Sequence, residues 1–218
     1  MSSIILSIIS IIIAVIAIIQ TSYQAKLSNK QHLFDRRLKI YMIVNGLLEL
    51  CKKEYMDLGK KKETKPLFAI EINFSFLTNN TYMENICEIM DHPLENPYKK
   101  NFLIKREELR QLASKILFVF GGKEATLFSE FVLAYENMLF KMHQYRIVIL
   151  HMQDEQEKEP RTYEEWGKYF HEPEWREEVY VARMRLKNAY DEINNNAVEK
   201  KIKKQISLVK RNKGELYK

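Results

Sequence analysis

Histidine, cysteine and carboxylate side chains are present, but their spacing fits no catalytic or metal site. None of the five histidines stands in an H-E-x-x-H or C-x-x-C context. His151, Asp154 and Glu155 fall on one helical face, which would suit a metal ion, but this spacing arises easily at the end of an acidic helix. The pairs Glu164-Glu165 and Glu177-Glu178 are adjacent residues. Adjacent residues point apart on a helix, so solvated side chains are expected and not an acid/base pair.

Nucleotide and thiol chemistry are disfavoured as well. Gly121-Gly122-Lys123 lacks both the spacing of a phosphate-binding loop and a preceding strand, and the chain has six glycines in all. Cys51 and Cys87 have no framework spacing, so both are expected to be small, reduced core residues and not a disulfide or metal pair. We therefore expect no enzyme, with no catalytic residue, no cofactor and no metal site.

The N-terminal segment is almost wholly apolar. Residues 4–19 are interrupted only by Ser7 and Ser10. A membrane-spanning helix needs about 20 apolar residues, with a lower limit near 17, so we predict a transmembrane anchor over residues 1–25. A signal peptide would show a basic residue before this stretch and a small-x-small cleavage site after it. A core helix at this position would rarely be apolar all round.

Basic residues follow the apolar stretch closely, and none precedes it. Because positive charge stays inside, we expect a single-pass protein of the cell (inner) membrane, with its N-terminus outside and its C-terminal domain cytoplasmic. Candidate lipid-headgroup contacts are Lys26, Lys30, Arg36 and Arg37. Alternatively, Arg36 and Arg37 lie on a well-packed helix beside a basic interface.

Small residues form a stripe along the anchor. They recur at steps of four and three, as Ser3, Ser7, Ser10, Ala14 and Ala17. Small residues let two transmembrane helices approach closely. The stripe predicts a self-association face and a homo-oligomer, unless the spacing is fortuitous.

The rest of the chain shows helical periodicity. We expect long helices over residues 20–58, 104–120, 123–152 and 176–209, and the clearest seam consists of Phe128, Phe131, Tyr135, Met138, Met142, Tyr145, Ile149 and Met152. Residues 67–77 fit either a helix or a strand, and helix is favoured because no partner strand is evident. A short helix is expected up to Met90, capped by Thr81 or Asn80.

The predicted fold is therefore all-α, with an N-terminal transmembrane helix continuous with a cytoplasmic antiparallel helical bundle. The bundle covers residues 26–198, of which 154–175 form an acidic connector. Residues 199–218 form a basic tail with eight Lys or Arg and two Glu. In an alternating arrangement this tail returns to the anionic inner leaflet; the alternative is a solvated tail. Nucleic acid is an unlikely partner, since the tail lacks interleaved aromatic residues and any recognisable motif.

Two short motifs carry a resemblance. The Ile-rich anchor followed by Phe34-Asp35-Arg36-Arg37-Leu38 and Ile40-Tyr41 resembles a widespread group of uncharacterised bacterial single-pass membrane proteins, whose first helix reads F-D-[KR]-R-x-x-I-Y. The stretch from Ile116 to Glu124 is similar to the aromatic "F-L-F" and "G-K-E" that join that group's second and third long helices. Residues 60–100 look like an insertion. The resemblance implies a defence or mobile-element context but no activity.

Together these patterns predict a membrane-tethered interaction or scaffold protein that contacts the lipid bilayer and an unknown protein partner. The alternative is a self-assembling, membrane-perturbing effector, as a defence or toxin component would be. The small-residue stripe favours the effector. A single span without a polar face disfavours it.

Overall fold

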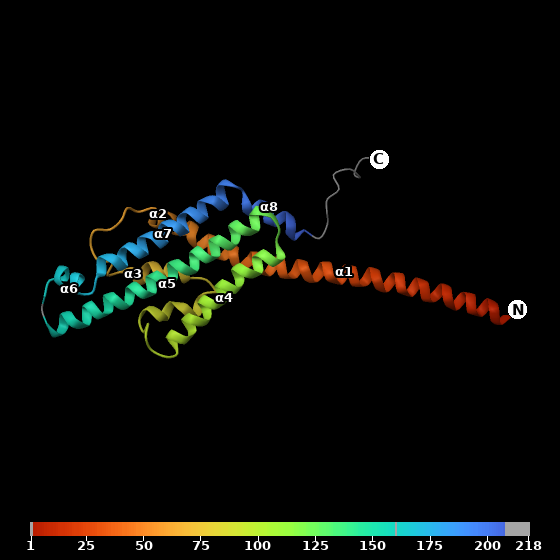
Figure 1. Ribbon diagram of the computed structural model, residues 1–218, viewed down its shortest axis with the longest axis horizontal. Coiled ribbons are helices and arrows are strands. Elements are labelled where there is room, and N and C mark those ends of the chain that lie inside the picture. Colours follow the sequence, from red (N-terminus) through yellow and green to blue (C-terminus); the bar gives the residue numbers. More distant parts are fainter. Residues whose placement is uncertain (1, 160, 208–218) are drawn as a thin grey trace.

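The computed structural model describes residues 2–159 and 161–207, and every regular element among them is helical (Figure 1). The predicted all-α class is therefore confirmed for the described part of the chain. The elements are α1 (Ser2–Lys53), α2 (Tyr55–Leu58), α3 (Ile70–Thr78), the 3₁₀ helix η1 (Glu84–Met90), α4 (Tyr98–Val119), α5 (Gly122–Lys158), α6 (Tyr163–Tyr169), α7 (Glu172–Asn195) and α8 (Val198–Ile206).

Helix α1 has two halves in very different surroundings. It runs for 52 residues, or about 78 Å, and its first half projects alone from the other helices (Figure 1). Among the described residues it is the one helix long and apolar enough to span a membrane, and none of its most apolar window is buried. Its second half enters the core, where Val44, Leu47 and Cys51 are fully buried. The predicted end at Gly59 is confirmed, although the chain turns once at Glu54 before α2.

The remaining helices pack with the second half of α1 into one body, residues 34–206, around a single apolar core. Helix α5 lies at its centre and packs most extensively against α7 and α4. All eight residues of the predicted α5 seam are buried. Consecutive long helices α4, α5 and α7 run in alternating directions (Figure 1).

The ambiguous segment over residues 67–77 is helical from Ile70 onward, as α3, which buries Phe74 and Leu77. The next predicted helix is shorter and tighter than expected, because η1 begins only at Glu84. Asn80 closes the turn before η1, since its side chain accepts a hydrogen bond from the Met83 N–H at 2.9 Å, but the N-cap of η1 is Met83, so neither Thr81 nor Asn80 caps this helix. Residues 60–100 thus contribute two helices to the core.

The predicted helix over residues 176–209 is wrong in two respects. It begins earlier, as α7 at Glu172, with Pro173 in the first turn, where proline is tolerated. It also breaks at Ala197, whose φ of 48° lies in the left-handed region. The core-facing positions step by five from Ile193 to Val198, which a straight helix cannot keep on one face. The turn into α8 lets Val198 and Ile202 reach the core.

The acidic segment over residues 154–175 is more regular than a connector. Helix α5 continues to Lys158, and α6 follows after a short gap. Thr162 and Glu165 form a capping box, in which the Glu165 N–H donates to the Thr162 hydroxyl at 3.3 Å and the Thr162 N–H donates to the Glu165 carboxylate at 2.8 Å. Trp166 pins α6 to the core.

Candidate functional site

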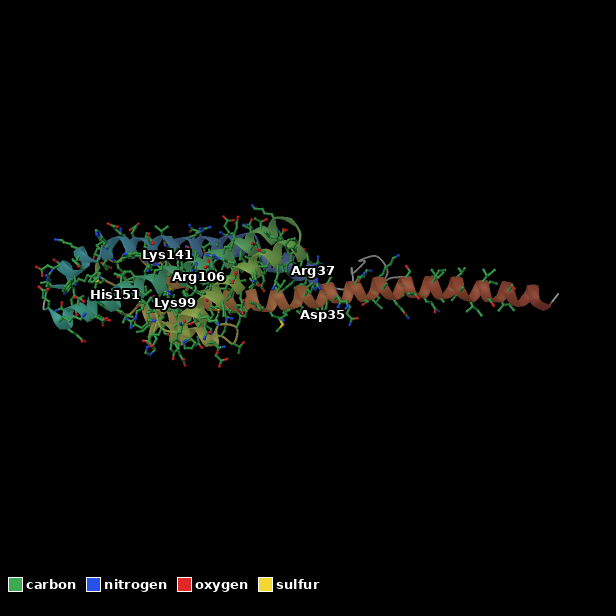
Figure 2. The ribbon with its side chains drawn as sticks, turned by 60° about the horizontal axis from the view of Figure 1, so that its bottom comes forward. Asp35, Arg37, Lys99, Arg106, Lys141 and His151 are labelled. Carbon is green, nitrogen blue, oxygen red and sulfur yellow. The ribbon has the colours of Figure 1, made fainter. Side chains whose placement is uncertain are left out.

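The two sequence motifs meet where α1 leaves the body. Arg37 donates through Nε to the Val119 carbonyl and through Nη1 to the Gln205 carbonyl, each at 2.6 Å. Its guanidinium also lies 5.8 Å from the centre of the Phe120 ring. Figure 2 labels Arg37 and Asp35 on opposite sides of α1 at this point. Arg37 therefore joins α1 to the end of α4 and to α8.

Gln205 completes the junction from α8. Its side-chain amide donates to the Gly121 carbonyl at 3.0 Å and accepts from the Gly121 N–H at 2.9 Å. Gly122 follows with a φ of 78°, a conformation that disfavours any residue with a Cβ. We call Arg37, Val119, Phe120, Gly121 and Gln205 the collar.

Ion pairs surround the collar and hold α8 against two neighbouring helices. The Tyr41 hydroxyl donates to the Glu199 carboxylate at 2.9 Å, and Lys203 pairs with the same carboxylate. The hydrogen bond from Lys203 lowers the pKa of Glu199, and its counterpart raises the pKa of Lys203. Lys201 lies 3.2 Å from Glu124 at the start of α5. None of these groups is an activated nucleophile or base. The collar contacts are therefore structural, and they connect α1, the end of α4 and α8.

The predicted lipid contacts occupy two environments. Lys26, Lys30 and Arg36 are exposed, and none has an ion-pair partner within the described part of the chain. Arg37 is half-buried and directs its guanidinium into the collar. On the apolar half of α1, Ser7, Ser10, Ala14 and Ala17 are exposed. The side chain of Ser3 and residues 208–218 of the predicted basic tail lie outside the described residues.

Exposed charge is distributed unevenly along the body. Near the collar the exposed side chains are mainly basic: Arg36, Lys39, Lys115, Lys200 and Lys204. At the opposite end, around the α5–α6 turn, they are mainly acidic: Asp154, Glu157, Glu159, Glu164 and Glu174. The basic end is the one from which the apolar half of α1 projects (Figure 1).

The candidate chemical groups stay separate. His151, Asp154 and Glu155 border an open hollow at the acidic end (Figure 2 labels His151), yet over the described ranges no three His, Cys, Asp or Glu side chains are placed to hold a metal. Glu165 serves the capping box. Glu177 pairs with Lys62 and Glu178 with Lys141, so neither forms a carboxylate dyad.

A groove between α1 and α4 was not foreseen from the sequence. This α1–α4 groove encloses about 670 Å³, and its principal lining residues are Arg36, Lys39, Ile40, Ile43, Leu112, Lys115, Phe118 and Val119. The signal in the sequence is basic residues beside apolar ones: Arg36 and Lys39 next to Ile40 on α1, and Lys115 next to Phe118 on α4. That signal has no meaning until the two helices are known to be neighbours.

Comparison with protein-family models, with curated proteins and with solved structures finds no match in any of the three. Over the residues that the structure describes, the fold defines an all-helical protein with one exposed apolar helix. The resemblance carried by the two motifs stays a prediction.

Proposed function

We propose that this chain is a membrane-tethered interaction or scaffold protein, with residues 1–25 as its anchor. The observation that carries the proposal is the exposed apolar half of α1. Ile11, Ile13, Ile18 and Ile19 each expose more than 60% of their surface. Moving one such side chain out of water contributes about 1.5–3 kcal/mol, so a bilayer that covers all of them would stabilise this arrangement strongly.

The continuity of α1 favours a retained anchor over a cleaved signal peptide. The same helix runs without a break from the apolar half into the core, where Val44 and Leu47 are fully buried. Cleavage after the apolar stretch would separate two halves of one rigid element. A buried core helix is equally disfavoured, because the apolar half contacts no other described element.

The charge distribution supports a cytoplasmic body. A basic end beside the anchor suits the anionic inner leaflet, where each basic side chain near the surface contributes about 1 kcal/mol. Lys26 and Lys30, which lie 7 and 11 residues beyond Ile19, are exposed and available for headgroups. The acidic end would then point away from like charge on the membrane, as an antiparallel bundle standing on an inner membrane requires.

The test uses the full-length chain with Phe118→Cys, since Phe118 is 89% exposed. We expect the protein to resist alkaline carbonate extraction, and a membrane-impermeant maleimide to label residue 118 only when the cytoplasmic face is open. The wild-type chain is the control, because Cys51 is buried and Cys87 is half-buried. Release by carbonate would refute the anchor, and labelling in intact cells would refute the orientation.

The small-residue stripe keeps the self-assembling effector as a second candidate. Single cysteines in place of Ser7, Ser10 and Ala14 should crosslink more than cysteines in place of Ile8 and Ile12. Induced expression with and without the first 25 residues then separates the two functions. Growth arrest that requires those residues would favour the effector, whereas normal growth would favour the scaffold.

A further inference from the structure

We propose that the α1–α4 groove binds one single-chain anionic amphiphile, such as a fatty acid or a lysophospholipid. The acyl chain lies along the apolar walls, and the anionic head binds the basic side chains at the mouth. The groove belongs to the body, so this binding does not depend on the function proposed above.

The walls of the groove are apolar and come from both helices. Ile40 and Leu112 form the floor and are only 8% and 4% exposed, and Ile43 is half-buried beside them. Phe118 stands at the rim with 89% of its surface exposed. An acyl chain would cover this apolar surface. The volume of about 670 Å³ falls in the range of sites that hold small ligands, roughly 300–1,000 Å³.

The charge around the groove is unbalanced. Arg36, Lys39 and Lys115 are exposed and have no ion-pair partner in the described part of the chain. Glu108 is the one acidic side chain among the lining residues, and it pairs with Lys105 at 2.6 Å. A carboxylate or phosphate would supply the missing negative charge, and the guanidinium of Arg36 suits either group in a bidentate contact.

The direction of the helices places the two parts of the ligand. Val119 is bonded to Arg37, so the end of α4 lies beside the point where α1 leaves the body. Arg36 and Lys115 therefore mark one end of the groove. Ile43 and Tyr82 mark the other. The head would sit at the basic end, with the chain running toward Tyr82.

The position along α1 favours a ligand that arrives from water. Arg36 lies 17 residues beyond Ile19, or about 25 Å along the helix. The headgroup layer adds only about 5–8 Å to the hydrocarbon on each side. On an upright anchor the groove thus stands clear of the bilayer. This choice of source, and only this, rests on the proposed anchoring.

The first experiment photolabels the full-length protein, held in an amphipathic polymer, with a fatty acid that carries a diazirine in its chain. Mass spectrometry of the products should place adducts on α1 residues 40–43 and α4 residues 112–119. Reversing two rim charges with Lys39→Glu and Lys115→Glu should weaken binding about tenfold, since each exposed charge contributes up to about 1 kcal/mol.

The matched control is Lys200→Glu with Lys204→Glu, which makes the same charge change on exposed α8 residues outside the groove. Equal losses in the two double variants, or adducts confined to residues 4–19, would overturn the proposal. Equal binding of a neutral monoacylglycerol with the same chain would overturn the role of the anionic head.

A second experiment separates a lipid from a protein occupant. A photoreactive phenylalanine analogue replaces Phe118 in the full-length chain, and cells are irradiated. An adduct with the mass of one single-chain anionic amphiphile on residue 118 supports the proposal. A crosslink to a protein overturns it in favour of a docked helix. Carbonate extraction reads out the anchor independently, so failure of one proposal is distinguishable from failure of the other.

Discussion

Replacing Arg37 with alanine tests whether the collar joins α1 to α8. Arg37 makes two charge-assisted hydrogen bonds, to the carbonyls of Val119 and Gln205, each at 2.6 Å. Hydrogen bonds to charged groups contribute about 1.5–3 kcal/mol each, and we take the low end because the site is half-exposed and water can replace the donor. The variant should lose about 2–3 kcal/mol of unfolding free energy. For a chain of this size that lowers Tm by about 5–10 °C.

Hydrogen exchange on the full-length protein localises the effect. The amides of α8 should lose protection in Arg37→Ala, whereas those at the centre of α5 should keep theirs, because α8 is a short helix held by the collar and its ion pairs. Arg37→Lys should lower the protection of the α8 amides as well, but by less than Arg37→Ala. Lysine keeps the charge, but its ammonium lacks the planar fork that reaches both carbonyls.

The neighbouring arginine provides the control. Arg36 is exposed and makes no hydrogen bond of this kind with the described residues, so Arg36→Ala should change stability by less than about 0.5 kcal/mol. If both alanine variants lower the exchange protection of the α8 amides equally, the loss of positive charge is responsible and the Arg37 contacts are not. If neither does, the collar contacts do not hold α8.

Three further predictions concern stability, each read from thermal unfolding of the full-length protein. Glu172→Ala should cost about 3–5 kcal/mol, because it removes the only carboxylate beside the buried Arg176 among the described ion pairs and leaves the Tyr145 hydroxyl without that acceptor, although Arg176 keeps its hydrogen bond to the Glu63 carbonyl. Glu174→Ala, at an exposed position, should cost little. Burial lowers the folded-state pKa of His143 to about 4, below its ordinary value of 6.5, so protons bind the unfolded chain first. Stability should fall as pH drops from about 6.5 to 4, by on the order of 2 kcal/mol, and a flat profile for the wild-type chain or an equal slope in His143→Gln would contradict this. Gly122→Ala should cost about 1–2 kcal/mol, because φ is 78° and the new Cβ would meet the Glu124 carboxylate at 2.6 Å; Gly121→Ala has open space and should be nearly neutral.

The parts of the fold that were predictable depend on local periodicity. The α5 seam repeats at steps of three and four, and all of its residues are buried. The end of the first long segment at Gly59 was equally visible, because glycine and lysines mark a helix end. Such signals need no knowledge of what lies across the core.

The break at Ala197 shows where local reasoning fails. Alanine favours helix more than any other residue, and nothing near it in the sequence is a turn former of the usual glycine or proline kind. Two signs were present: the drift of the apolar positions from Ile193 to Val198, and the three asparagines of residues 194–196, a residue type favoured at turns and helix ends. Burial of Val198, Ile202 and Ile206 outweighs the cost of one left-handed residue.

The collar and the groove were beyond the sequence for a different reason. Arg37 looked like one more basic residue after the anchor, and its partners Val119 and Gln205 are 82 and 168 residues away. Both partners are backbone carbonyls, which every residue has. No side-chain pattern records such a contact, so it could be found only by placing α4 and α8 beside α1.

The contacts of Arg37 determine how a movement of the long helix α1 would be transmitted to the rest of the body. One unbroken helix joins the exposed apolar half of α1, the proposed anchor, to the buried residues Val44 and Leu47, so a tilt or rotation of that half must move the core or bend the helix. Arg37 lies between these regions, at the first level where α1 has neighbours to hold it. The same level carries the basic rim of the groove, at Arg36 and Lys39. A ligand in the groove would therefore contact α1 directly beside the collar, since Val119 belongs to both, and at this junction movement of the proposed anchor and binding on the body could influence each other.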